Sequence, residues 1–480
     1  MKLPSSPLSP EAITQTLDSY RSNDLQWKTG RTFGYVYDPG RDAASIAKAA
    51  YASYLTENGL DPTAFPSLLR LENEIVAMVR AHLRGDENVV GTFTSGGTES
   101  IMLAVKSARD RARATHPSRD RFEIVLPVTA HAAFWKACHY LGVHPVVTPV
   151  DPTSFRADVA AMASAITEHT VMLVGSAPSY AHGVVDPIRE IAALASSRGL
   201  LCHVDGCVGG FLLPFWKRLG ADVPDFDFGV PGVTSLSVDL HKYAFAPKGA
   251  SLVFHRDASL RKHQIFACAE WTGYSVVNMA VQSSKSGGPL AGAWATLYRI
   301  GDEGYLDISR VMRDATARII AGIKSIPELR VMGHPDFCMV AFTSDTVNVF
   351  HIADEMKERN WYVQAQFKRG PSKENLHLSI GPTNEPWVDA FVKDLRECVA
   401  VAKGLPPSEI AATVRSAMSE MDPATITDET IEQMMSLAGA QSDGLPSRLA
   451  GINEILNEMP APLAERAFVS FMNGMFRAAS

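Results

Sequence analysis

Lys242 stands where a lysine can do covalent chemistry. It lies in VTSLSVDLHKYAFAPKG (residues 233–249), which begins as an alternating, β-branched run typical of a buried strand. The run stops at Asp239, His241 and Lys242. The carboxyl ends of strands in an α/β sheet form the ligand crevice, and a lysine partly removed from water there loses proton affinity and becomes an amine nucleophile. A surface lysine in a loop is the alternative that this stretch alone leaves open.

Residues 91–100, GTFTSGGTES, predict a site for an anion. The segment joins a strand pattern to a strongly helical run, so backbone N–H groups are exposed at the positive end of a helix dipole. Gly96 and Gly97 allow close approach of the backbone, and Thr98 can add a hydroxyl bond to a phosphate. A turn that only caps the helix, with Ser95 or Thr98 as the N-cap, explains the same pattern.

Other strand ends also carry polar residues. His131 follows a strand at 124–126, and the segment SAPSY (176–180) follows a strand at 171–175. His203 and Asp205 lie two apart near the end of a strand, so they point to the same face. Burial of a carboxylate is costly unless a cation lies nearby, and the motif around Asp205 contains none, so packing alone does not explain this residue. If these strands are neighbours, their polar ends meet in one crevice.

The elements that position these residues alternate in type. Strands and helices of about ten to fifteen residues alternate from the first glycine-rich turn onward, which indicates a parallel-rich sheet with helices on both faces. Beyond Gly301 the pattern changes to a long helix and short strands, typical of a smaller α+β domain. We predict an N-terminal arm (1–60), a large α/β domain (61–300), a small domain (301–404) and a helical tail (405–480).

The composition narrows the class of protein. The chain has 480 residues, 46% of them hydrophobic and 20% charged, with a net charge of −7 and dispersed basic residues, which fits a soluble enzyme and argues against nucleic-acid binding. Six cysteines without a CxxC pair indicate reduced thiols and a cytoplasmic location. We expect no signal peptide, no membrane span and no metal site.

Five segments, taken in order and spacing, resemble the group II decarboxylase family of pyridoxal-phosphate enzymes, and within it the sphingosine-1-phosphate lyases. They are TSGGTES (94–100), HAAFWKA (131–137), SAPSYAHGVVDP (176–187), HVDGCVGGF (203–211) and SVDLHKYAFAPKG (237–249). The resemblance implies the aspartate aminotransferase-like fold (fold type I), with a mostly parallel, seven-stranded sheet in the large domain.

The resemblance also implies the catalytic roles. Lys242 would bond to pyridoxal phosphate as a Schiff base, and Asp205 would keep the pyridine nitrogen protonated so that the ring accepts electrons. His131 would stack on the ring, although a core histidine is the alternative, and Tyr180 matches an active-site tyrosine.

Further residues would hold the cofactor. Gly97, Thr98 and His241 would bind its phosphate, and His203 would support Asp205. Cys207 would lie near the cofactor without a catalytic role, as a small buried hydrophobe.

A loop at 283–288 matches one that reaches the cofactor phosphate of the neighbouring subunit in this family. Ser284 matches its phosphate-binding serine, whereas Lys285 replaces an arginine and loses the bidentate fork. The implied assembly is a homodimer with two shared sites.

The substrate half of the site departs from the family pattern. Lys248 and Tyr37 match residues that bind a substrate phosphate, with a surface lysine and a packed aromatic as alternatives. Asp61 replaces a phosphate-binding histidine and would repel a phosphate unless Lys248 or Lys285 neutralised it. Val276 replaces a tyrosine and can neither donate nor accept a proton.

The resemblance implies a carbon–carbon lyase that splits a phosphorylated sphingoid base by retro-aldol chemistry into a fatty aldehyde and ethanolamine phosphate. An amino-acid α-decarboxylase (a carboxy-lyase) on the same scaffold is the alternative. A protein that binds the cofactor but has lost catalysis is disfavoured, because Lys242, Asp205 and His131 are all present.

Overall fold

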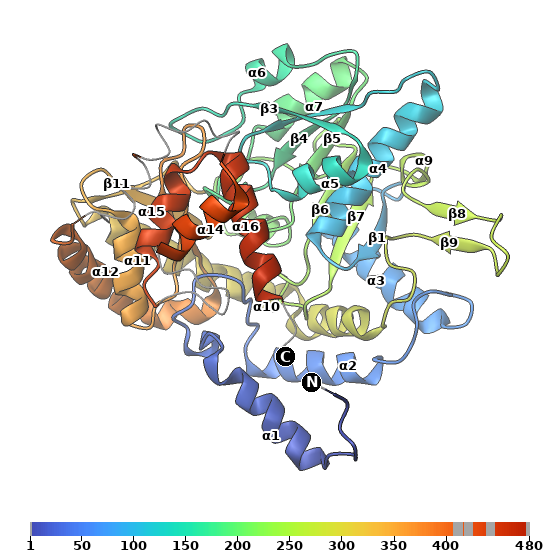
Figure 1. Cartoon of the computed structure of the whole chain (residues 1–480). Coiled ribbons are helices and arrows are strands. Elements are labelled where there is room, and N and C mark those ends of the chain that lie inside the picture. The colour runs from blue at the N-terminus through green and yellow to red at the C-terminus, as the bar shows by residue number, and fades with distance from the viewer. Residues whose placement is uncertain (1, 407–415, 417–425, 438–446, 477–480) are drawn as a thin grey trace.

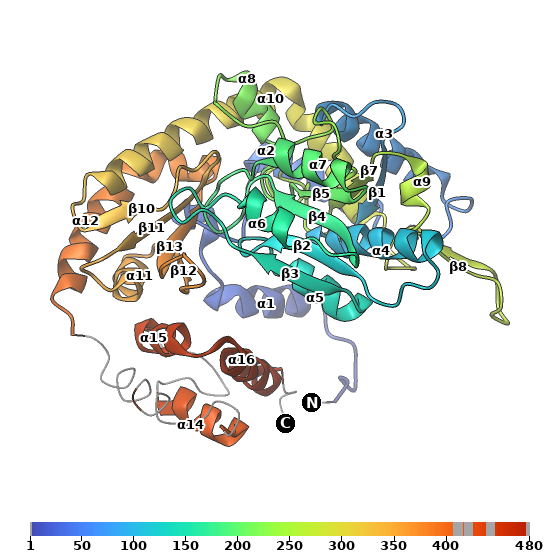
Figure 2. The same ribbon diagram turned by 90° about the horizontal axis from the view of Figure 1, so that it is seen from above.

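A seven-stranded sheet forms the centre of the large domain in the computed structural model, which describes residues 2–406, 416, 426–437 and 447–476 (Figures 1 and 2). In sheet order the strands are β1 (Val90–Thr94), β7 (Ser251–His255), β6 (Ser235–Val238), β5 (Leu201–Asp205), β4 (Thr170–Ser176), β2 (Glu123–Pro127) and β3 (His144–Thr148). Strand β7 runs antiparallel to both neighbours, and the other pairs are parallel. The predicted fold class is therefore confirmed.

The alternation of residues along each strand explains the layered core. Leu173 of β4 packs with α3 (Pro66–His82) and α7 (Ile188–Ser197) in one apolar cluster. Its neighbours Met172 and Val174 point to the opposite face and pack with α4 (Gly97–Thr115) and α5 (Ala133–Leu141) in another. Because successive side chains of a strand face opposite sides, a strand that is apolar throughout is covered by helices on both faces.

The small domain has a sheet of its own, in the order β10 (Leu329–Val331), β11 (Met339–Ser344), β13 (Asn375–Ser379) and β12 (Gln364–Gln366), all antiparallel. Helices α11 (Val349–Glu358) and α12 (Val388–Lys403) accompany it. The long helix α10 (Gly288–Lys324) connects the two domains. The boundary that we predicted after residue 300 falls inside α10, at a kink where Gly301 takes a φ of 65°. Glycine adopts that backbone conformation without a steric penalty.

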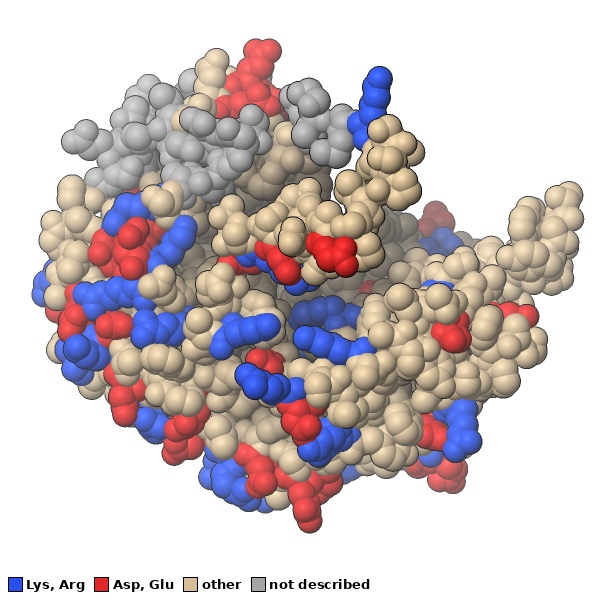
Figure 3. Space-filling model, turned by 90° about the horizontal axis from the view of Figure 1, so that it is seen from below, with Lys and Arg blue, Asp and Glu red and all other residues tan. Residues whose placement is uncertain are grey.

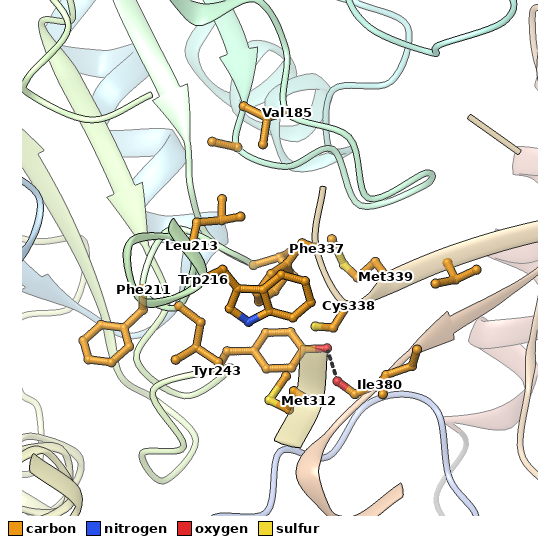
Figure 4. Close-up of a cluster of buried hydrophobic side chains, with 14 of the residues drawn as sticks. Val185, Phe211, Leu213, Trp216, Tyr243, Met312, Phe337, Cys338, Met339 and Ile380 are labelled. Atoms are coloured by element: carbon orange, nitrogen blue, oxygen red, sulfur yellow. Dashed lines mark hydrogen bonds between the residues drawn. The ribbon is translucent and has the colours of Figure 1, made fainter. Parts of the chain in front are cut away.

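An apolar cluster joins the two domains directly behind Lys242. Trp216 and Tyr243 of the large domain pack against Phe337, with ring centroids 4.9 and 5.1 Å away (Figure 4). The Tyr243 hydroxyl donates a hydrogen bond to the Ile380 carbonyl at 3.1 Å. Burial of large aromatic rings contributes several kcal/mol, about 1.5–3 per side chain. The residue next to Lys242 is therefore anchored in the domain interface.

The arm and the tail flank this body. The arm contains α1 (Pro10–Tyr20), none of whose residues is buried, and α2 (Arg41–Ser53), which packs along α10. The described part of the tail contains α14 (Asp428–Leu437), α15 (Ala450–Glu458) and α16 (Ala461–Met475). The Asn348 amide donates to Glu454 at 2.6 Å and fastens α15 to α11. The described tail is helical, as predicted; its other residues lie outside the described chain.

Short elements complete the chain. A two-stranded hairpin, β8 (Phe266–Cys268) and β9 (Val276–Asn278), projects from the large domain at the right of Figure 1. The remaining helices are α6 (Val159–Ser164), α8 (Leu213–Arg218) and α9 (Ala258–Arg261), with 3-10 turns at Arg21–Asn23, Trp27–Thr29 and Pro382–Trp387. No helix in the described ranges is long and apolar enough to cross a bilayer. On the face in Figure 3, described Lys and Arg side chains are interspersed with Asp and Glu.

Candidate active site

The ends of β2, β4, β5 and β6 meet the start of α4 around a cavity of about 340 Å³, here called the Lys242 cavity. Eight predicted site residues line it: Gly97, Thr98, His131, Tyr180, Asp205, Cys207, His241 and Lys242. The other lining residues are Ser95, Gly96, Glu99, Ile101, Ser176, Pro178, Val208 and Asp239. Parallel strands bring their carboxyl ends to one edge, which is why residues so distant along the chain converge.

Asp239 holds Lys242 in an ion pair. Its Oδ2 lies 3.0 Å from the Lys242 Nζ, and the aspartate is only 2% exposed. Burial lowers the pKa of Lys242, but the charge and hydrogen bond of Asp239, together with the neighbouring Cys207 and Tyr37, raise the pKa above its ordinary value. The predicted loss of proton affinity is therefore wrong for the free lysine. We did not predict Asp239 as a site residue; its signal was its position three residues before Lys242 in a tight turn.

The glycine-rich turn has the form of an anion site. The N-cap of α4 is Gly96, which has no side chain, so the alternative of a turn capped by Ser95 or Thr98 is wrong. Backbone N–H groups at the start of α4 remain free of a side-chain cap and face the cavity. A Cβ on Gly97 would lie 2.8 Å from Asp239 and 2.9 Å from the Cys207 sulfur, so only glycine fits.

Glu99, in the first turn of α4, organises this region without having been predicted. Its Oε2 accepts a hydrogen bond from the Ser95 N–H at 2.6 Å, and its Oε1 accepts one from the Val281 N–H at 2.6 Å. The carboxylate therefore ties the glycine-rich turn to the segment that follows the β8–β9 hairpin.

His131 and Asp205 form facing parts of the cavity wall. The Ala133 N–H donates to the His131 Nδ1 at 3.1 Å, so that nitrogen is the acceptor. Desolvation lowers the pKa of His131 more than the charge of Asp205 raises it, although the residue as a whole is exposed, so the neutral form of the ring is favoured. Asp205 is 6% exposed and accepts the Cys207 N–H at 3.0 Å. A neutral aromatic ring and a carboxylate thus face the same space.

His203 is the predicted site residue that the structure places elsewhere. Its Nδ1 lies 2.9 Å from the Ser235 hydroxyl and its Nε2 lies 3.3 Å from the Ser237 hydroxyl. It does not line the Lys242 cavity, and no hydrogen bond between described residues joins it to Asp205. We therefore correct the predicted support of Asp205 by His203. The His203 ring bonds to serines of the neighbouring strand β6 and packs edge-on against Phe134.

His203 makes the stability of the protein sensitive to acid. Burial lowers the pKa of His203 to about 3, whereas the unfolded chain titrates near about 6.5. The unfolded state therefore binds more protons below that value, and stability is lost as the pH falls toward about 3. Between about pH 7 and about pH 5, the wild type should lose about 2 kcal/mol more of its free energy of unfolding than His203→Gln does. Urea unfolding at each pH measures this difference. His139→Gln, at an exposed site, is the control. If the free energy of unfolding depended on pH equally in the wild type and both variants, the assignment would be contradicted.

The predicted substrate residues lie at the rim of the Lys242 cavity. The Lys248 Nζ donates to the Tyr35 carbonyl at 3.0 Å and lies 4.8 Å from the centre of the Tyr37 ring. Burial of the ammonium group, and then the charge of Lys242, lowers the pKa of Lys248. Tyr37 packs edge-on against Tyr243, with centroids 4.8 Å apart. Lys248 and Tyr37 are therefore brought together, beside but not within the wall of the cavity.

Tyr180 lines the Lys242 cavity, and residues of the small domain hold its side chain in place. Its hydroxyl donates to the Gln364 Oε1 at 2.5 Å, and its ring stacks on His377 with centroids 4.4 Å apart. Burial raises the pKa of Tyr180, so the phenol is neutral and acts as a donor. Gln364 and His377 carried no sequence signal, because their role depends on how the two domains pack.

A second cavity of about 720 Å³, here called the Lys248 cavity, adjoins the first and shares Ser95 and Glu99 with it. Ser284 and Lys285 line it, together with apolar residues that include Leu60, Leu68, Phe93, Val277, Met279 and Leu290. The Ser284 loop is bonded to its own chain, because the Gly59 N–H donates to the Lys285 carbonyl at 2.8 Å. Ser284 therefore does not reach the Lys242 cavity of its own chain.

Asp61 and Val276, the two departures from the family pattern, lie outside both cavity walls. The Asp61 carboxylate accepts hydrogen bonds from the Thr63 N–H at 2.8 Å and the Thr63 hydroxyl at 2.6 Å. These bonds hold the pKa of Asp61 below its ordinary value. The carboxylate thus completes a local turn, and its repulsion of a substrate phosphate stays a prediction. Val276 lies on the projecting hairpin.

Two buried polar atoms of the Lys242 cavity indicate that a ligand binds there. The Ser176 hydroxyl and the Asp239 Oδ1 have no hydrogen-bond partner among the described residues. Buried polar groups are costly unless they are paired. A free helix N-terminus, a planar histidine, a carboxylate and a lysine fit a small, planar ligand with an anionic group, and the volume lies in the range of small-molecule sites, about 300–1,000 Å³. Pyridoxal phosphate has these features.

Comparisons with known proteins agree with this chemistry. The family model "Pyridoxal-dependent decarboxylase conserved domain" matches residues 4–344, and a model for a C-terminal domain of pyridoxal-dependent enzymes matches residues 409–474. The sphingosine-1-phosphate lyase of Arabidopsis thaliana is 40% identical over 402 residues, which cover 82% of this chain and 73% of that protein. The Dictyostelium discoideum sphingosine-1-phosphate lyase is 37% identical, covering 86% and 78%.

Solved structures show the same fold. A sphingosine-1-phosphate lyase of Burkholderia pseudomallei superposes with a TM-score of 0.81 at 34% identity, covering 88% of this chain and 96% of that chain. A glutamate decarboxylase of Lactobacillus brevis superposes with a TM-score of 0.74 at 19% identity, covering 85% and 96%. The second likeness concerns the fold alone.

Proposed function

Because the chain belongs to the pyridoxal-dependent decarboxylase family, and to the sphingosine-1-phosphate lyases within it, we propose that it is a pyridoxal-phosphate-dependent carbon–carbon lyase. Its substrate would be a phosphorylated sphingoid base, split by retro-aldol cleavage into a fatty aldehyde and ethanolamine phosphate. The observation that carries the proposal is the convergence of Lys242, Asp205 and His131 on one cavity that a free helix N-terminus closes.

The residues of the Lys242 cavity divide the work of binding the cofactor. Lys242 Nζ would bond to it covalently, while Thr98, His241 and the N–H groups from Gly97 onward would bind its phosphate. The neutral ring of His131 would stack on the pyridine ring, and Asp205 would hold a proton on the ring nitrogen. When bound, pyridoxal phosphate supplies an electron sink for the pair released by a breaking bond.

Asp205, in this arrangement, must remain charged beside the ligand. Its Oδ1 already accepts the Cys207 N–H at 3.0 Å, which orients the carboxylate.

The substrate side of the site suits a phosphorylated lipid. Lys248, at the boundary of the two cavities, would bind the substrate phosphate, with Tyr37 beneath its ammonium group. The apolar side chains of the Lys248 cavity would contact the hydrocarbon chain. Tyr180, whose phenol is neutral and held by Gln364, would donate a hydrogen bond and not act as a base.

A homodimer with shared sites is part of the proposal. Ser284 lines the Lys248 cavity but not the Lys242 cavity of its own chain, so a second copy would be needed to bring it to a cofactor phosphate. The projecting hairpin exposes apolar rings, with Trp271 at 53% and Tyr274 at 59% exposure, and α1 buries none of its residues. Large exposed apolar groups favour an interface.

The six cysteines are free thiols, which supports a cytoplasmic location.

Incubation of the protein with pyridoxal phosphate and a phosphorylated long-chain sphingoid base is expected to release a long-chain aldehyde and ethanolamine phosphate. The same base without its phosphate should react much more slowly, because Lys248 then has no anion to bind. Mass spectrometry of both products measures the reaction. An absence of aldehyde, together with carbon dioxide released from an amino acid, would sink the lyase proposal in favour of the α-decarboxylase.

A further inference from the structure

Asp239 is the charged group closest to the reactive lysine, and the proposed function gives it no role. Its Oδ2 lies 3.0 Å from the Lys242 Nζ and 3.6 Å from the His241 Nε2. At 2% exposure the carboxylate has almost no contact with water, so it needs a cation. Among the described residues, His241 and Lys242 are the two candidates within ion-pair distance.

His241 provides little of the positive charge. The Ala250 N–H donates to its Nδ1 at 3.2 Å, so that nitrogen is an acceptor and cannot carry a proton at the same time. Burial lowers the pKa of His241 in spite of Asp239. The ring is therefore neutral, and the ammonium group of Lys242 compensates the carboxylate.

Other titratable groups also face Lys242, and a second carboxylate, Asp205, lines the same cavity. They come from the arm, from the ends of β2, β4 and β5, and from the turn after β6: Tyr37, His131, Tyr180, Cys207 and Lys248. Burial keeps the two phenols and the thiol neutral by raising each pKa. His131 is neutral, and Lys248 has the same sign as Lys242. Within the described chain, Asp239 is the carboxylate in ion-pair contact with Lys242.

The carboxylate of Asp239 also borders the anion site. Oδ1 is buried without a hydrogen-bond partner, and it lies 2.9 Å from the position that a Cβ on Gly97 would take. Both oxygens of the carboxylate therefore border the glycine-rich turn, and Oδ2 also holds the lysine, so Asp239 links the two functional parts of the cavity.

We propose that Asp239 is a positioning residue that holds the free Lys242 side chain as an ammonium ion aimed into the cavity, and so restricts its reaction with carbonyl compounds until the cofactor enters. Only the neutral amine adds to a carbonyl carbon. The ammonium proton passes to Asp239 Oδ2, and the nitrogen lone pair forms the new C–N bond. The two remaining amine hydrogens leave with the carbonyl oxygen as water, so a C=N bond replaces the C=O bond. In this proposal, only the identification of the carbonyl compound as the aldehyde pyridoxal phosphate rests on the proposed function.

The test is the pH dependence of Lys242 labelling in the protein freed of cofactor. Formaldehyde with cyanoborohydride methylates neutral amines, and peptide mass spectrometry follows each lysine at a series of pH values. In the wild type, Lys242 is expected to label with a midpoint above that of the surface lysines of the same chain. In Asp239→Asn the midpoint should fall by about one pH unit or more, a rate increase of about tenfold at neutral pH, because burial then acts unopposed.

Asp205→Asn is the matched control. It removes the same charge from the same cavity but makes no ion pair with Lys242, so the labelling midpoint should fall by clearly less than in Asp239→Asn. A wild-type midpoint at or below that of surface lysines would overturn the proposal, even if Asp239→Asn failed to fold. An unchanged midpoint in folded Asp239→Asn would also overturn it. Labelling needs neither cofactor nor substrate, so this outcome is independent of the lyase assay.

Discussion

Lys242→Ala is expected to lose both the covalent attachment of pyridoxal phosphate and the cleavage of the phosphorylated sphingoid base. Alanine leaves no amine in the cavity, so nothing can bond to the aldehyde carbon of the cofactor. We expect the rate of cleavage to fall by about 10³-fold or more, equivalent to about 4 kcal/mol of transition-state stabilisation. Borohydride reduction followed by mass spectrometry should show a pyridoxyl adduct on the peptide of Lys242 in the wild type and none in the variant.

The control for this prediction is Lys262→Ala, which removes an exposed lysine from the same domain. It should retain the adduct and the wild-type rate. Asp239 would be left as a buried carboxylate without its cation in Lys242→Ala, so a loss of thermal stability is expected as well. An adduct on another lysine, with aldehyde still produced at the wild-type rate, would contradict the assignment of Lys242.

Asp205→Asn is expected to keep the cofactor attached but to slow cleavage by about 10²- to 10³-fold. The amide keeps the shape of the side chain, and its oxygen can still accept the Cys207 N–H, so the local fold should survive. An amide carries no charge, however, and cannot hold a proton on the ring nitrogen of the cofactor, so the ring accepts electrons less readily. Steady-state rates of aldehyde release, normalised to the bound cofactor, measure the effect.

The cofactor content separates the two variants. Asp205→Asn should still yield the borohydride adduct at Lys242, whereas Lys242→Ala should not. A wild-type rate in Asp205→Asn would show that this carboxylate does not support the electron sink. Complete loss of the adduct would show instead that Asp205 acts in binding, which contradicts the assigned role.

Local patterns in the chain were enough to predict the large domain. Each strand that ends in the Lys242 cavity combines an apolar run with a polar residue at its carboxyl end, as in HVDGC and SVDLHK. This signal lies within a few residues, so it can be read without knowing the partners. The seven-stranded sheet, its predominantly parallel order and the pyridoxal-phosphate family are confirmed.

Most features that the sequence did not predict depend on contacts made through space. His203 and Asp205 share a face of β5, yet His203 bonds to the serines of β6 because it sits two residues deeper in the sheet. The sequence left open whether Asp61 contacts a phosphate, and in the fold its carboxylate accepts a hydrogen bond from Thr63. For a local reason, the long helix predicted beyond Gly301 begins earlier, at Gly288: the helix continues across a kink at Gly301.

The order of its strand-end residues, read from the sequence alone, determined the family, the cofactor and the class of fold of this protein. Tertiary structure decided how those residues behave. The proton affinity of Lys242 depends on a balance between burial and the charge of Asp239, which no residue pattern expresses. The orientation of Tyr180 depends on Gln364, 184 residues away and in the other domain. Burial and charge act over distances of a few ångströms in space, and only the packed chain sets those distances.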